Sequence, residues 1–226
     1  MRDSHLCLHR AGLTLSLGVR RPYELSGQLI VTDGTGTPEQ VVSALNESRS
    51  LYHVVLHLAA FRMRRPEAQN HGAGTGQLEA LLERLRRIEI PEMEHAHSFR
   101  VTCNRSGTHA FGSMDVERAF GAQLVERFGT RVSLEHFDTH VRVDVVDTLV
   151  LLGIQLTNES LDKRYDWVFR PRVTLRTVLA YGMLQLAELD RTSRRILDPF
   201  CGSGTILFEA ASIFPEAEIL GCDHRE

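Results

Sequence analysis

Lysine is almost absent from this 226-residue sequence: Lys163 is the only one among 26 lysine and arginine residues. The positive charge is therefore carried by arginine, whose planar guanidinium suits phosphates and base stacking. A codon bias toward arginine accounts for the same composition more simply. The formal net charge of −3 argues against nucleic-acid binding through bulk charge, so any such contact must come from a local patch.

Long apolar runs and paired cysteines are also missing. The longest apolar run, residues 149–156, is far shorter than the roughly 20 residues of a membrane helix. The N-terminus shows no apolar core followed by the small-residue cleavage site of a secretory signal. The cysteines, none of them in a Cys-x-x-Cys pair or at metal-ligand spacing, are Cys7, Cys103, Cys201 and Cys222. We therefore expect a cytoplasmic protein with reduced thiols, no metal and no membrane partner.

One stretch, residues 195–211, organises the chain around a glycine turn. It reads as a buried strand that ends at Asp198, followed by Gly202 and Gly204 and by an apolar helix that begins at Thr205. Glycine allows positive φ angles and close approach of a ligand, and the helix start points unpaired N–H groups at the turn. A surface turn without a ligand is the alternative. A P-loop is disfavoured because no Gly-Lys-Ser/Thr follows the glycines.

A second acid lies at the spacing that cofactor-binding folds use. Glu218-Ile-Leu-Gly-Cys-Asp223 reads as another apolar strand that ends in an acid. Doubly wound folds place a carboxylate about 20 residues after the glycine turn, where it binds ribose hydroxyls. Cys201, inside the turn, could act as a nucleophile, but a small residue that fits a crowded turn is the simpler interpretation.

The segment Asp198-Pro-Phe-Cys-Gly-Ser-Gly-Thr205 resembles the S-adenosylmethionine-binding motif of Rossmann-like methyltransferases, especially those that act on exocyclic amines of bases. The resemblance implies that the turn surrounds the methionine and ribose part of S-adenosylmethionine. It also implies that the second acid binds the ribose hydroxyls. The residues that it assigns to the cofactor are Asp198, Pro199, Cys201, Gly202, Gly204, Thr205 and Asp223.

Before this stretch, the chain alternates strand and helix patterns. Thr37 and Gln40 form a capping box for a helix that starts at Pro38. A polar, turn-rich loop at residues 66–76 precedes an amphipathic helix with its apolar residues at 3–4 spacing. At residues 98–156 the order is strand, basic loop, helix and three strands, with Ser113 as the expected N-cap and Gly129 as the end of the helix.

That last order resembles the THUMP domain, an RNA-binding module. The matching residues are Phe99-Arg-Val, Arg105, His109-Ala-Phe111, the helix to Gly129, Val132-Ser-Leu134 and Val141-Arg-Val-Asp-Val145. The resemblance implies a THUMP domain at residues 50–157, after a ferredoxin-like part at residues 1–49, that holds the acceptor-stem end of tRNA or another structured RNA. It gives Arg105 and His109 as RNA-binding candidates. A local ion pair for Arg105 and a packed turn for His109 are the alternatives.

A connector at residues 158–172 mixes cations with aromatic rings. Lys163, Arg164, Arg170 and Arg172 interleave with Tyr165, Trp167 and Phe169, a combination used for phosphate contacts and base stacking. We count these cations as RNA-binding candidates, with a packed interdomain linker as the alternative. The amphipathic helix that follows opens the methyltransferase part at residues 173–226. The resemblance places residues 174–177 near the methionine end of the cofactor.

The predicted fold class is α/β: an α+β THUMP region followed by the first part of a Rossmann-like, doubly wound methyltransferase sheet. The resemblance implies a tRNA guanine-N2 methyltransferase that moves a methyl group from S-adenosylmethionine to the N2 amine of a guanosine. Such an in-line attack needs positioning and no metal. An rRNA guanine-N2 methyltransferase and a non-catalytic RNA-binding protein are the alternatives. A thiouridine synthetase is disfavoured, because no Ser-Gly-Gly loop follows the RNA-binding module.

The sequence offers no catalytic residue. Family members hold the target amine with an Asp/Asn/Ser-Pro-Pro-Tyr/Phe motif whose aromatic ring stacks on the flipped base. None of the 7 prolines in this sequence adjoins another. A doubly wound sheet also needs more strands than the two predicted from Ile196 and Ile219. We therefore expect the front part of a longer enzyme, which alone binds S-adenosylmethionine weakly or not at all and transfers no methyl group.

Overall fold

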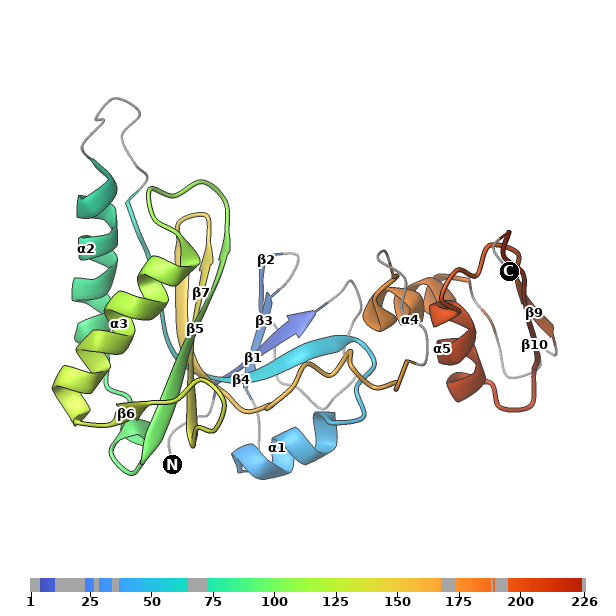
Figure 1. Cartoon of the computed structure of the whole chain (residues 1–226), viewed down its shortest axis with the longest axis horizontal. Coiled ribbons are helices and arrows are strands. Elements are labelled where there is room, and N and C mark those ends of the chain that lie inside the picture. Colours follow the sequence, from blue (N-terminus) through green and yellow to red (C-terminus); the bar gives the residue numbers. More distant parts are fainter. Residues whose placement is uncertain are drawn as a thin grey trace.

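The computed structural model describes residues 5–10, 23–26, 29–33, 37–64, 73–167, 174–187, 189 and 195–224. Figure 1 shows these residues in two parts: a large sheet with helices beside it, and a smaller part that holds the last two helices and strands. The predicted α/β class is confirmed. Within the described ranges, no helix combines the length and apolar character needed to cross a bilayer.

The large sheet has the strand order β2-β3-β1-β4-β8-β7-β5-β6. β5 (Ser98–Ser106) runs parallel to β6 (Arg131–Val132) and β7 (Thr139–Val146), and the other neighbours are antiparallel. β4 (Leu51–Arg62) pairs with β1 (His5–Arg10) on one side and with β8 (Leu149–Gln155) on the other. The sheet therefore continues across the boundary predicted at residue 50. The other N-terminal strands are β2 (Tyr23–Ser26) and β3 (Leu29–Asp33).

Helices α2 (Ala73–Arg86) and α3 (Ser113–Phe128) lie together on one face of this sheet (Figure 1). Leu85 and Phe120 of these helices are fully buried in one core with Val141, Val143 and Val145 of β7. Val141-Arg-Val-Asp-Val145, named above among the residues that resemble a THUMP domain, thus forms a strand whose alternating valines face this core. A 3-10 turn, η1 (Pro91–Met93), connects α2 to β5.

Polar side chains on the other face of β7 are buried as well. Arg142 donates two hydrogen bonds to the Asp144 carboxylate (2.9 and 3.1 Å) and a third to Gln155 Oε1 (2.7 Å). His140 Nε2 lies 2.9 Å from the hydroxyl of Thr102 on β5. Burial, with help from two nearby arginine charges, lowers the pKa of His140 to about 4. This face is therefore a hydrogen-bonded polar layer that holds His140 neutral at physiological pH.

The helix ends follow the predicted caps with one shift. Thr37 and Gln40 form the expected capping box at the start of α1 (Pro38–Leu45), with bonds of 3.4 and 2.9 Å. The N-cap of α3 is Gly112 and not Ser113, because the Asp115 carboxylate reaches back to accept a 2.7 Å hydrogen bond from the Gly112 amide. Gly129 ends α3 in the left-handed conformation, as predicted.

The second part contains α4 (Thr177–Leu186), β9 (Arg195–Asp198), α5 (Thr205–Ile213) and β10 (Glu218–Gly221). β9 and β10 pair in parallel, with Asp198 opposite Gly221. Ile196 packs with Ala210 and Phe214 of α5 in the core of this part. The carboxyl ends of both strands thus lie at the same edge as the start of α5, where parallel sheets bind ligands.

Candidate functional site

A glycine turn joins the end of β9 to the start of α5. The Phe200 amide donates to Asp198 Oδ1 (3.1 Å), which bends the chain just after the strand. Gly202 and Gly204 have φ angles of 53° and 78°, a left-handed region that side chains with a Cβ rarely adopt. A Cβ placed on Gly202 would have no heavy atom within 4 Å, so the backbone here is open to a ligand. The predicted strand, turn and helix are present, but the strand is not buried as expected: Ile196 is buried, whereas Leu197 is 61% exposed.

The end of β10 is bonded directly to this turn. The Gly202 amide donates a 2.9 Å hydrogen bond to Asp223 Oδ2. Two backbone bonds lie beside it, from Cys201 N to Cys222 O (2.8 Å) and from Cys222 N to Asp198 O (2.9 Å). The two acids that the sequence separates by 25 positions therefore flank one turn, as the spacing predicted.

Gly221 is a site residue that the sequence reasoning did not single out. A Cβ on Gly221 would collide with Leu207 Cδ1 and would come within 3.1 Å of Cys201 Sγ. Its lack of a side chain therefore lets β10 lie against the glycine turn and the first turn of α5. The signal was present in the sequence as a glycine directly before the acidic end of the second strand.

Cys201 is poorly suited to act as a nucleophile. Desolvation raises the pKa of its thiol, and the negative charges of Asp198 and Asp223 raise it further. The thiolate, which is the reactive form, is disfavoured by both effects. This agrees with the interpretation of Cys201 as a small residue that fits the turn.

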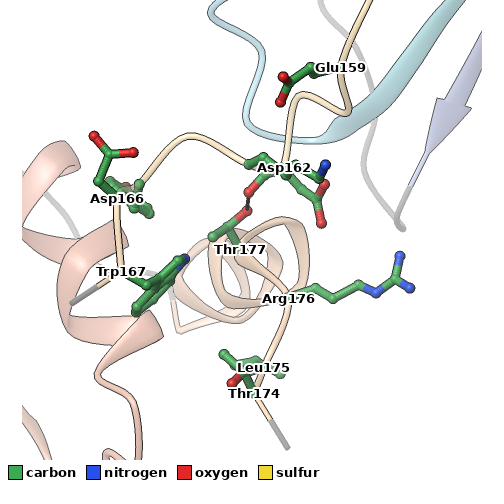
Figure 2. Close-up of a pocket in the computed structure, with 10 residues that line it drawn as sticks. Glu159, Asp162, Asp166, Trp167, Thr174, Leu175, Arg176 and Thr177 are labelled. Atoms are coloured by element: carbon green, nitrogen blue, oxygen red, sulfur yellow. Dashed lines mark hydrogen bonds between the residues drawn. The ribbon is translucent and has the colours of Figure 1, made fainter. Parts of the chain in front are cut away.

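A cavity of about 240 Å³ lies between the connector and the start of α4. Figure 2 shows Asp162, Asp166 and Trp167 reaching it from the connector, and Thr174, Leu175 and Arg176 from the segment before α4. Its remaining lining residues are Glu159, Lys163, Tyr165 and Thr177. The segment 174–177 thus lines a cavity, and its place near the methionine end of the cofactor stays a prediction.

Aromatic rings connect this cavity to the glycine turn. The Trp167 ring meets the Phe208 ring of α5 edge-on, with 5.2 Å between centroids. A Cβ on Gly204 would touch the same Phe208 ring at 3.6 Å. Only one aromatic side chain therefore separates the wall of the cavity from the turn.

Arg105 and His109 hold a loop against the turn between β7 and β8. Arg105 Nη1 donates to Gly107 O (3.0 Å) and lies 3.2 Å from His109 Nδ1. His109 Nε2 donates to the carbonyl of Asp147 (2.5 Å), which itself has a positive φ of 52°. The structure thus brings the two residues into contact, and among the described residues the hydrogen-bond partners of Arg105 are a carbonyl and a histidine.

Two sequence families match this chain, each over a different range. The THUMP domain family matches residues 76–155, and the family described as RMKL-like, methyltransferase domain, matches residues 167–222. The chain therefore carries a THUMP domain followed by an RMKL-like methyltransferase domain. The THUMP match covers α2 to β8, and the methyltransferase match begins at Trp167 and includes the cavity segment 174–177, the glycine turn and β10.

Named relatives of this THUMP-containing chain modify guanine. The tRNA (guanine(6)-N2)-methyltransferase of Thermus thermophilus is 41% identical over 160 residues, which cover 69% of this chain and 44% of the relative. The bovine tRNA (guanine(6)-N(2))-methyltransferase THUMP3 is 44% identical over 115 residues, covering 50% and 22%. The human U6 snRNA (guanine-N(2))-methyltransferase THUMPD2 is 32% identical over 128 residues, covering 56% and 25%. The chain spans less than half the length of these curated relatives.

Solved structures share the fold of both parts. The crystal structure of TrmN from Thermus thermophilus aligns with a TM-score of 0.67 at 29% identity, covering 97% of this chain and 65% of that one. A methylase from Clostridium difficile aligns with a TM-score of 0.64 at 21% identity, covering 93% and 55%. The second likeness shows a shared fold and nothing more.

The described cations of the connector, Lys163 and Arg164, lie in different environments. Lys163 is exposed and lines the cavity. The Arg164 guanidinium points inward, 3.0 Å from the carboxylate of Glu209, and its side chain is only 17% exposed. It is occupied by protein partners, which favours the packed-linker alternative for this residue. Arg170 and Arg172 lie outside the described residues.

Proposed function

We propose that the protein transfers a methyl group from S-adenosylmethionine to the N2 amine of a guanosine in tRNA. The observation that carries the proposal is the hydrogen bond between Gly202 and Asp223, which builds a cofactor-type edge in the same chain as a THUMP domain. The name of the Thermus thermophilus relative supports tRNA as the RNA class. A cytoplasmic location is part of the same proposal.

The residues at this edge fit the cofactor by their chemistry. A carboxylate accepts hydrogen bonds from ribose hydroxyls. The carboxylate of Asp223 lies next to the turn, and 22% of the side chain is exposed. Gly202 leaves backbone open at the turn, and the amides at the start of α5 face the same side. Asp198, Pro199, Cys201, Gly204 and Thr205 complete the proposed cofactor set.

When bound, S-adenosylmethionine supplies an electrophilic methyl group on a sulfonium. In the transfer, the N2–C bond would form as the S–C bond breaks, S-adenosylhomocysteine would leave, and the proton lost by the amine would pass to solvent. The protein's contribution to such a displacement is orientation, which holds the amine in line with the breaking bond. Because the sequence has no adjacent prolines, we assign the contact with the amine to no residue of this chain.

For RNA binding, we propose the THUMP domain, with Arg105 near the end of β5 and His109 in the β5–α3 loop, and the connector with Lys163. Arg105 and His109 lie at the end of β5 that carries the β7–β8 turn, where their loop is partly exposed. Arg170 and Arg172 stay sequence-based candidates. Phosphate contacts by arginine would give the steep salt dependence typical of RNA binding without requiring a positive net charge overall.

Nucleoside analysis of RNA from a strain that lacks the gene tests this function in the protein's natural form. We expect N2-methylguanosine to be lost from tRNA and restored by the wild-type gene, but not by Asp223→Ala. Loss from rRNA or from a spliceosomal RNA, with tRNA unchanged, would assign another RNA. Unchanged N2-methylguanosine in every RNA class would support a non-catalytic RNA-binding protein and overturn the proposal.

A further inference from the structure

Glu209 is a fully buried carboxylate on α5, one helical turn after the glycine turn. Arg49, from the loop between α1 and β4, donates a 2.8 Å hydrogen bond to Glu209 Oε2. Arg164 of the connector brings its Nε within 3.0 Å of Glu209 Oε1. One acid of the methyltransferase part is therefore held by one arginine from the part with the large sheet and one of the connector. We call these three residues the ionic clasp.

Further hydrogen bonds fix the arginines of the ionic clasp in place. Arg164 Nη2 donates to the carbonyl of Arg49 (2.9 Å) and lies 3.3 Å from the hydroxyl of Thr177 at the start of α4. Arg49 Nη1 also donates to the hydroxyl of Tyr165 (3.1 Å), and that hydroxyl donates to the carbonyl of Phe208 (3.3 Å). The clasp thus joins the α1–β4 loop, the connector and both helices of the methyltransferase part.

Both arginines of the clasp keep their charge at neutral pH. Burial lowers the pKa of Arg164, and the Glu209 carboxylate opposes that shift. For Arg49, burial also lowers the pKa, but the hydrogen bonds to Glu209 and Tyr165 outweigh it and the net shift is upward. The two pKa shifts differ in direction because of the geometry. Arg49 donates a hydrogen bond to Glu209 Oε2, whereas Glu209 Oε1 accepts no hydrogen bond from the described residues. Arginine stays protonated in either case.

We propose that Arg49, Arg164 and Glu209 are positioning residues, whose clasp fixes the cofactor turn at one distance and angle from the RNA-binding sheet. Domains joined by a short connector move relative to one another unless their interface prevents it. A buried carboxylate that needs two arginines has few alternative arrangements, so it favours one relative orientation of the two parts. An apolar contact at the same place would allow the parts to slide against each other. The consequence for function rests on the proposed function: RNA bound by the THUMP domain is presented at the cofactor turn.

Distances between the two parts test the ionic clasp without any ligand. Nitroxide labels on Glu126→Cys in α3 and Glu216→Cys after α5, both exposed sites, would be measured by double electron–electron resonance. In this background Cys7, Cys201 and Cys222 are replaced by serine, and the buried Cys103 is kept. We expect one narrow distance distribution, which broadens about twofold in Glu209→Gln as the interface loosens. Glu83→Gln is the matched control, since Glu83 pairs with Arg87 on the exposed surface of α2 (2.7 Å).

A second variant separates positioning from folding. In Arg49→Met/Arg164→Met/Glu209→Met, the clasp is replaced by apolar side chains of similar size, which often preserves stability. We expect this variant to fold, by its circular dichroism and melting, and still to show the broad distribution. A distribution as narrow as that of the wild type, in this variant or in Glu209→Gln, would overturn the clasp as the positioning device.

An RNA readout tests the consequence. Alkylation of the exposed Cys222 in the otherwise native chain reports access to the cofactor turn, with the buried Cys103 as an internal control. We expect saturating tRNA to slow alkylation of Cys222 in the wild type but not in Glu209→Gln, with equal tRNA affinity for both. Equal protection in both would contradict the positioning role. If tRNA does not bind the wild type, the proposed function fails, and the distance measurement still decides on the clasp.

Discussion

The Gly202 amide donates a 2.9 Å hydrogen bond to the Asp223 carboxylate, so the glycine turn and the acid of the second strand are joined within the chain itself. The sequence predicted that these two residues would share a ligand, and the structure adds that they contact each other. A carboxylate already oriented by a backbone donor needs little further ordering to accept ribose hydroxyls. This preorganisation leads us to expect measurable, though weak, cofactor binding by this chain.

The close approach of β10 to the turn makes Gly221 sensitive to the smallest side chain. In Gly221→Ala, the new methyl group would displace the end of the Leu207 side chain and crowd Cys201, so the turn and the strand must shift by a few tenths of an ångström. We expect S-adenosylmethionine binding, measured by isothermal titration calorimetry, to be weakened while tRNA binding is unchanged. Gly76→Ala is the control, because a Cβ there has no heavy atom within 4 Å. Unimpaired cofactor binding by Gly221→Ala would show that this contact does not shape the site.

Glu209 should contribute strongly to the stability of the methyltransferase part. Glu209→Ala leaves Arg49 and Arg164 without their buried partner, which costs about 3–5 kcal/mol by comparison with other broken buried ion pairs. Hydrogen exchange of the α5 amides should speed up accordingly, while the amides of β5 and β7 are unaffected. Glu83→Ala, at an exposed pair, should leave both regions unchanged. Equal exchange rates in α5 of Glu209→Ala and the wild type would contradict this prediction.

His140 should make the stability of the THUMP sheet depend on pH. Its pKa falls from 6.5 to about 4 on folding, so between these values the unfolded chain binds a proton that the folded chain does not. Stability is therefore intact above pH 6.5 and is lost progressively toward pH 4, by roughly 3 kcal/mol for a shift of this size. In urea unfolding monitored at β5 and β7, His140→Gln should lose less stability over this range. An identical pH slope in the two proteins would refute the assignment.

Local patterns in the sequence predicted the elements well, because each depends on neighbours in the chain. The valine alternation of β7 and the Thr37–Gln40 capping box are examples. The N-cap of α3 was wrong by one residue, because glycine gives no side-chain signal and the deciding group is Asp115 further along. β6 is shorter than predicted, because Leu134 lies beyond its end and is 66% exposed. The apolar character of Leu134 therefore did not indicate a buried strand.

The site was predictable only where its residues are close in sequence. The glycine turn and Asp223 lie within one strand–helix–strand unit, and their spacing identifies them. Arg49 and Glu209 are 160 positions apart, and no periodicity connects them. Arg164 was counted with the RNA-binding cations because it stands among aromatic residues and arginines, whereas the structure directs its guanidinium to Glu209. Such long-range ion pairs depend on tertiary packing, which one sequence does not reveal.

RNA binding should depend on Arg105 more than on other exposed arginines of the THUMP domain. We expect Arg105→Ala to weaken tRNA binding several-fold and to lower the slope of log affinity against log salt by about 1, as for one lost phosphate contact. Arg87→Ala, which removes an arginine paired with Glu83 on α2, is the control. Fluorescence anisotropy with labelled tRNA over a range of salt concentrations measures both quantities. Equal affinities and slopes for the two variants would assign Arg105 to the loop structure alone.

The most direct test of a cofactor site is to map S-adenosylmethionine binding on the protein by NMR. Titration of the ¹⁵N-labelled chain into the millimolar range detects weak binding and locates it residue by residue. We predict that the amide signals of Asp198, of residues 200–205 and of Asp223 shift and saturate together, and that Asp223→Ala weakens binding by roughly 1–3 kcal/mol. ATP at the same concentrations should leave these signals in place. Shifts elsewhere in the chain, or none at saturating S-adenosylmethionine, would contradict the account.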